Sequence, residues 1–294
     1  RVATQLDMSA TEAAQWSKDI SAYLSELGAK TGAVSKDMAE AFYFIMSGMD
    51  TTREGALAML EPLAKFSVAG VVDPAAAAKF LTSVMNTYGD ELARVGDLQA
   101  QVTHVLDTTL YSVRKGRADV NDFITGWGRA AQMGKLAGAS FEENLAILTA
   151  LSRVFTPAQA VTSTENFFKA LVKQSDDAAA ALDELNIPLY VKDLATGLER
   201  HRQPINVLSD LINAIAKLPQ SQADKYVTRI FGDLRGMRGA LTLQDVEIMN
   251  DVKQWFVDFI NLKPGEETAR QFEIMSQGLS GQVNIMREAA KALG

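Results

Sequence analysis

The sequence predicts an all-α fold, an array of short antiparallel helices packed as a bundle. Apolar residues recur at steps of three and four along most of the chain, which is the spacing of one helix face. Capping residues and glycines interrupt that spacing at short intervals. The chain has 294 residues, of which 47% are hydrophobic and 22% are charged, so it can form one large or two smaller helical cores.

The first predicted helix begins behind a capping box formed by Ser9 and Glu12. We expect Gly28 to stop it. Its apolar stripe consists of Ala13, Trp16, Ile20, Tyr23, Leu24 and Leu27. A second helix is predicted from Ser35 to Gly48, and its all-round apolar stretch "AFYFIM" indicates a central position.

The third predicted helix begins with a box of Thr51 and Glu54, and Pro62 inside it should kink it. The stretch "AKFSVAGVVDPAAAAKFLTSVMNTYG", residues 64–89, then contains a helix end, a tight turn and a complete helix.

In that stretch we place Gly70 at a left-handed C-cap, Asp73 at the N-cap and Pro74 at the first helical position. Gly89 should close the helix. The predicted buried face is formed by Ala77, Phe80, Leu81, Val84, Met85 and Tyr88.

A further helix is predicted over 97–115, and Asp119 should cap the next one. Three glycines weaken that helix, at about 1 kcal/mol each relative to alanine, and indicate close helix contacts or a bend. They are Gly126, Gly128 and Gly134. Gly138 ends the helix, and Ser140 with Glu143 forms the next capping box.

Thr156-Pro157 begins another helix, and Ser175 caps a short helix that ends at Asn186. Residues 187–203 alternate around a Thr-Gly turn, which predicts a small β-hairpin. Helices follow from Pro204 and near Ser221. A glycine-broken connection, "FGDLRGMRG", precedes the helix that Pro264 stops.

The last segment shows a heptad-like seam, which predicts a coiled-coil-like C-terminal helix. The seam residues are Phe272, Met275, Leu279, Val283, Met286, Ala290 and Leu293. Four of them fall seven residues apart. We expect the seam to associate copies of the chain as a parallel trimer, with the helix continuing beyond the final glycine.

No catalytic, cofactor or metal site is predicted, and we expect a non-enzymatic protein. No nucleophile motif accompanies His104 and His201, the only two histidines, and the chain has no cysteine for a disulfide, a thiolate or a Cys-based zinc site. The carboxylate pairs at 142–143 and 176–177 both lie in the first turn of a helix, where the helix dipole accounts for them.

The "GDLRGMRG" stretch lacks the Gly-Lys-Ser/Thr ending of a P-loop. We interpret Arg229, Arg235 and Arg238 as a solvated or interface cluster. The net charge of −7 leaves no global basic footprint for nucleic acid, and no apolar run reaches membrane-spanning length. The chain begins with Arg, so we expect a processed chain or a part of something longer.

The order of these motifs resembles the core region of bacteriophage tail tape measure proteins over roughly residues 35–245. The resemblance is carried by "AFYFIMSGMDTTREGALAMLEPLAKFSVAGVVDPAAAAKFLTSVMNTYG", "GRADVNDFITGWGRAAQMGKLAGASFEENLAILTAL", "DDAAAALDELNIPLY" and "RIFGDLRGMRGALTL". Two features depart from the family pattern. "AQAVTSTENFF" replaces a Gly-rich turn, and Asn186 stands where the family has Gly.

The resemblance implies a structural protein that lies in the tail tube or tip, in the virion, after assembly in the host cytoplasm. It implies a role in tail-length determination and release ahead of the DNA. Implied partners are other copies of the chain as a trimer, tail tube and distal tip proteins, tail assembly chaperones and the host envelope at ejection. No specific nucleic acid and no cofactor are expected.

We expect four regions: an N-terminal helix (1–33), a helical tape measure core (34–186), a hairpin plus helices (187–264) and the start of a heptad-bearing helix (265–294). One alternative is a non-viral α-helical scaffold or adaptor that binds partner helices. Another is a cell-wall hydrolase, for which the sequence shows no catalytic constellation.

Overall fold

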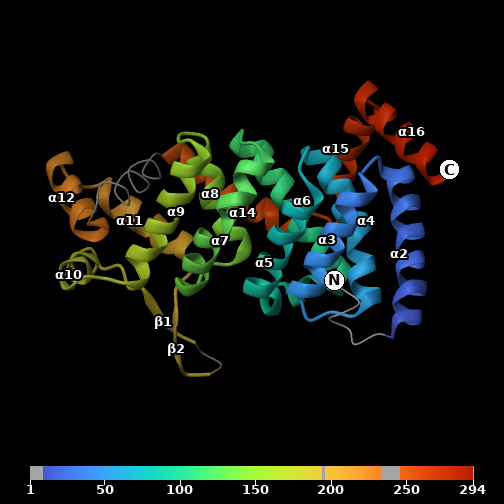
Figure 1. Cartoon of the computed structure of the whole chain (residues 1–294). Helices are drawn as coiled ribbons and strands as arrows, with labels where there is room; N and C mark the ends of the chain where they lie inside the picture. The colour runs from blue at the N-terminus through green and yellow to red at the C-terminus, as the bar shows by residue number, and fades with distance from the viewer. Residues whose placement is uncertain (1–8, 194–195, 233–245, 294) are drawn as a thin grey trace. The chain divides into compact units, whose positions relative to one another are not determined.

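The computed structural model describes residues 9–193, 196–232 and 246–293 and confirms the all-α class (Figure 1). The first helices are α2 (Ala10–Thr31), α3 (Ser35–Gly48), α4 (Arg53–Gly70), α5 (Pro74–Leu92), η1 (Ala93–Val95), α6 (Leu98–Gly116) and α7 (Val120–Leu136). They are followed by α8 (Phe141–Ser152), α9 (Pro157–Val172), α10 (Asp176–Glu184), α11 (Pro204–Ile215), α12 (Gln220–Phe231), α14 (Val246–Asn261), α15 (Glu266–Gln277) and α16 (Leu279–Leu293).

The chain forms two compact units. Unit 1 comprises residues 1–111, 119–125 and 262–294, and unit 2 comprises residues 112–118 and 126–261. These boundaries differ from the four regions expected from the sequence. Residues 33 and 186 each lie within a unit, whereas residue 264 lies near the point where the chain re-enters unit 1.

In unit 1, α3 packs on α5, α15 on α4 and α16 on α2. The core contains the predicted face of α5, since all six of its residues are buried. Asp73 caps α5 by accepting the N–H of Ala76 at 2.9 Å, and Pro74 occupies the first helical position. Both capping predictions are confirmed.

Two glycines predicted to stop helices lie inside them instead. Helix α2 runs past Gly28 to Thr31, and Gly32 (φ 77°) is its C-cap. A Cβ at Gly28 would lie 2.7 Å from Ser35 Oγ, so this glycine permits a close approach rather than a stop. Helix α5 likewise runs past Gly89 to Leu92.

The turn between α4 and α5 also differs from its prediction. Gly70 is the last helical residue, and Val71 adopts the left-handed conformation (φ 50°). A Cβ at Gly70 would lie 3.0 Å from Val120 Cγ2, which explains the glycine by packing. At the other end of α4, Thr52 rather than Thr51 is the N-cap and accepts the N–H of Gly55 at 3.1 Å. Helix α4 continues on both sides of Pro62.

In unit 2, α8 packs on α9 and α14, and α10 packs on α12. The predicted close contacts of α7 are confirmed at Gly126, where a Cβ would lie 2.6 Å from Val161 Cγ2. The predicted hairpin is confirmed as antiparallel strands β1 (Tyr190–Lys192) and β2 (Glu199–His201). Asn186 has φ 57°, so it adopts the left-handed conformation that glycine favours.

Candidate interaction surfaces

The C-terminal seam lies on two helices rather than on the single helix that the heptad spacing predicts. Helix α15 ends at Gln277, Gly278 is extended (φ −65°, ψ 154°), and α16 begins at Leu279. The backbone is crowded at this bend. A Cβ at Gly281 would lie 2.8 Å from Ser276 Cα and would also contact the Met275 carbonyl oxygen.

The break divides the seam residues between two environments. Phe272 and Met275 on α15 are half-buried, whereas Val283, Met286 and Ala290 on α16 are exposed. Met286 is the most exposed of these, at 72%. The side chains of Leu279 and Leu293 lie outside the described residues.

Helix α16 contacts α2 and the start of α3 through its opposite face. Glu288 is buried, and its Oε2 accepts a hydrogen bond from Ser35 Oγ at 3.2 Å. A Cβ at Gly32 would lie 3.1 Å from Ile285 Cγ1. Because positions 285 and 288 lie about half a turn from 283, 286 and 290, the exposed part of the seam faces away from α2.

A buried carboxylate on α6 holds the start of α15. Asp107 is fully buried and accepts the backbone N–H groups of Gly265 and of Thr268, the latter at 2.9 Å. Gly265 is the N-cap of α15 and provides no side-chain cap of its own, so Asp107 satisfies two of the free N–H groups of that helix end. The sequence pattern around Asp107 does not indicate this role.

Burial raises the pKa of Asp107 above its ordinary value of 3.8, although the hydrogen bonds from Thr268 and Gly265 oppose the shift. A raised folded-state pKa stabilises the fold below the unfolded pKa, and this contribution is lost as pH rises through the folded pKa. We therefore expect the unfolding free energy of the wild type, taken relative to that of Asp107→Asn, to decrease as the pH rises from 4. Urea unfolding of both chains over a pH series measures it, and a difference that grows with pH would contradict the assignment.

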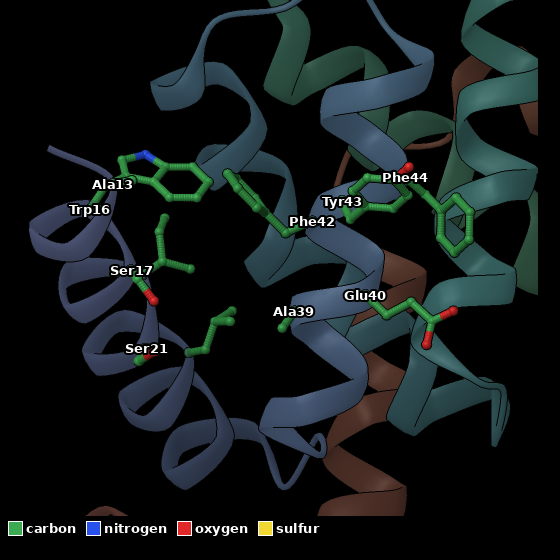
Figure 2. A pocket seen from close by; sticks show the side chains of 11 residues that line it. Ala13, Trp16, Ser17, Ser21, Ala39, Glu40, Phe42, Tyr43 and Phe44 are labelled. Carbon is green, nitrogen blue, oxygen red and sulfur yellow. The ribbon is translucent and has the colours of Figure 1, made fainter. Parts of the chain in front are cut away.

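An apolar groove lies between α2 and α3, with a volume of about 550 Å³. Figure 2 shows Trp16 and Phe42 facing each other across it, and their ring centroids are 5.8 Å apart. The Arg53 guanidinium lies 6.0 Å from the centre of the Trp16 ring. The lining is otherwise small or apolar, and its polar groups are those of Ser17, Ser21, Glu40 and the Tyr43 hydroxyl. A lining of this kind favours van der Waals contacts with other apolar side chains.

The two histidines lie in different environments. His104 is buried on α6 in unit 1, and His201 lies on β2 in unit 2, where its ring centroid is 4.5 Å from that of Tyr190. Among the residues that the structure describes, no group of three or more His, Asp or Glu side chains could hold a metal ion.

The two carboxylate pairs have structural partners. Glu142 and Glu143 are fully buried, and Glu143 accepts the N–H of Ser140 and that of Ile205, each at 3.1 Å. It therefore caps the starts of both α8 and α11. Asp177 forms an ion pair with Arg229 at 2.7 Å.

Arg229 also pairs with Glu184 at 2.9 Å, so it is held within unit 2. The other two members of the predicted cluster, Arg235 and Arg238, lie outside the described residues.

No single helix in the described ranges has both the length and the apolar character to cross a membrane. Helix α4 and the stretch Pro74–Val95 meet these criteria only as a pair, with a bend of 118° between them. Their apolar side chains form much of the core of unit 1.

The family described as phage-related minor tail protein matches residues 21–232, which is more than half of the chain. No curated protein and no solved structure matches the chain. The matched range contains α3 to α12 and the second half of α2. The chain therefore belongs to the phage-related minor tail protein family and has a structural role in the phage tail.

Proposed function

We propose that the chain is a folded anchoring region of a tail tape measure protein. In this role it lies in the tail tube or tip, takes part in setting tail length during assembly and leaves ahead of the DNA. The observation that carries the proposal is the order of caps and glycines over residues 35–245. This order resembles the tape measure core, and it falls largely within the range that the minor tail protein family matches.

The helix lengths support anchoring rather than measuring. An α-helix rises about 1.5 Å per residue, so a helical ruler needs long unbroken helix. The longest described helix, α2, has 22 residues and therefore spans about 33 Å. We place the measuring coil in another part of the full-length protein and propose that this region docks to tail tube and tip proteins.

Tail lengths of assembled particles test this division of labour. Removing heptads from a long coil of the full-length protein should shorten tails by about 10.5 Å per heptad. A matched deletion of the hairpin over residues 190–201 should leave tail length unchanged, because that hairpin adds no axial rise to a coil. Tails whose length does not change after coil deletions would contradict the proposal.

We further propose that three copies associate through the seam, in parallel. The exposed part of the seam on α16 consists of Val283, Met286 and Ala290. These residues are three and four positions apart, which is the a/d spacing of a coiled coil. Met286→Glu should abolish the cross-linked trimer, because it places a charge in the apolar seam. Val257→Glu, at an exposed apolar position on α14, is the matched control and should leave the trimer intact.

Assembly chaperones in the host cytoplasm and the host envelope at ejection remain proposed partners, and a catalytic role is not part of the proposal. Affinity purification from infected cells, before and after lysis, measures the first of these contacts. A chaperone bound to the chain only before particles mature would support it.

A further inference from the structure

The seam cannot act as one unit in the arrangement that the structure shows. Its heptad spacing continues from Phe272 to Leu293, but the helix that would carry it is interrupted at Gly278. Phe272 and Met275 are half-buried in unit 1, while Met286 is largely exposed. Only the α16 half of the seam is therefore available to another chain.

Besides their packing on α4 and α2, the two helices are held by polar contacts near their opposite ends. Asp107 caps the start of α15, and Glu288, near the end of α16, accepts a hydrogen bond from Ser35 Oγ at 3.2 Å. Water can replace such hydrogen bonds when the helices leave, so these contacts cost less to break than an equal area of apolar packing.

The bend depends on a residue without a side chain. At Gly281 a Cβ would meet the backbone of Met275 and Ser276, so alanine does not fit the folded-back arrangement. A continuous helix through the same position would accept alanine and would gain about 1 kcal/mol of helix propensity over glycine. The same substitution therefore has opposite effects on the two arrangements.

We propose that residues 266–293 form an arm with two arrangements. In one it is folded back as α15 and α16 on unit 1. In the other it is released as one continuous heptad helix, whose partners are the same segments of two further copies. The inference rests on the proposed trimer and adds that trimer formation requires release of the arm.

A disulfide lock tests the requirement. A Cβ at Gly32 would lie 3.6 Å from the Cβ of Asn284, within the range of about 3.5–4.5 Å that a disulfide requires. Because the chain has no cysteine, Gly32→Cys with Asn284→Cys introduces the only pair. The reduced protein should form trimers when its mass is measured by light scattering, and the oxidised protein should stay monomeric. The reduced form of the same variant controls for the strain of a side chain at Gly32, whose φ is 77°.

The reverse variant is Gly281→Ala, which should lower the concentration at half-assembly by about tenfold. Gly89→Ala is the matched control, because Gly89 lies inside α5 with no atom within 4 Å of its added Cβ. Hydrogen exchange at the amide of Thr268 reports release independently, since that amide is bonded to Asp107 in the folded-back arm. Exchange there should accelerate in Gly281→Ala and not in Gly89→Ala.

The outcomes separate the two proposals. Trimers in both the oxidised and the reduced protein would overturn arm release and leave the trimer standing. Monomers in every variant at every concentration, including Gly281→Ala, would overturn the trimer and the arm together. An unchanged assembly concentration and unchanged exchange in Gly281→Ala would overturn release alone.

Discussion

Replacing Trp127 by alanine should lower the unfolding free energy of unit 2 by about 3–5 kcal/mol. Trp127 is fully buried on α7, and its ring meets that of Phe141 edge-on at 5.5 Å between centroids. Truncation removes the apolar contact area and leaves a cavity that the surrounding helices fill only in part. Urea unfolding followed by tryptophan fluorescence in a Trp16→Phe background, where the signal comes from unit 2 and includes the buried Trp255, measures the loss.

Leu198→Ala is the control for this measurement. Leu198 is 70% exposed in the same unit, so its truncation should change the unfolding free energy by no more than about 0.5 kcal/mol. Equal unfolding midpoints for the two variants would show that the Trp127 site is not a close-packed core.

Glu143→Ala should cost about 2–4 kcal/mol, because it removes the acceptor from two helix starts at once, one of them buried. The carboxylate accepts the N–H of Ser140, in the capping box of α8, and that of Ile205, in the first turn of α11. The Ile205 N–H is buried, so water does not replace the carboxylate there, whereas the Ser140 N–H is only partly buried. Denaturant unfolding measures the cost, and Glu143→Gln, which keeps one amide oxygen as an acceptor, should lose less.

Glu12→Ala provides the exposed counterpart. Glu12 completes the same kind of capping box with Ser9 on α2, with its carboxylate 2.9 Å from the Ser9 nitrogen. Solvent can hydrate that N–H when the carboxylate is removed, so the loss should be clearly smaller than for Glu143→Ala. If the two losses were equal, burial would not be the cause of the Glu143 effect.

Helix starts could be predicted from the sequence because they depend on local chemistry. Asp73 with Pro74, and Ser140 with Glu143, each combine an acceptor and a favourable first turn within four residues. The hairpin could be predicted for the same reason, since its alternation and its Thr-Gly turn lie within a few residues of each other.

Helix ends were harder to predict than helix starts, because glycine occurs for two different structural reasons. At Gly32 it adopts positive φ, but at Gly28 and Gly70 it lies within a helix, where a neighbouring side chain comes close. Only tertiary structure separates these uses. At the end of α4 the left-handed position is taken by Val71, which local preference disfavours.

The candidate surfaces could be predicted only in part, because they too depend on tertiary structure. Heptad spacing identifies which residues share a stripe, but the stripe is the same whether the helix is continuous or interrupted at Gly278. Asp107 gave one local signal, a carboxylate between the buried positions Leu106 and Leu110. Its partners, Gly265 and Thr268, lie more than 150 residues away along the chain, so the sequence pattern does not show them.

Unit 1 is closed by its most distant segments, and this has a consequence for synthesis on the ribosome. Ser35 and Glu288, which join α3 to α16, are 253 residues apart. At a translation rate of about 5–20 residues per second, roughly 13–50 s pass between their synthesis. Throughout that interval the faces of α2 and α4 that later receive α16 and α15 have no covering helix, so the nascent chain presents them uncovered to any holdase at the ribosomal exit.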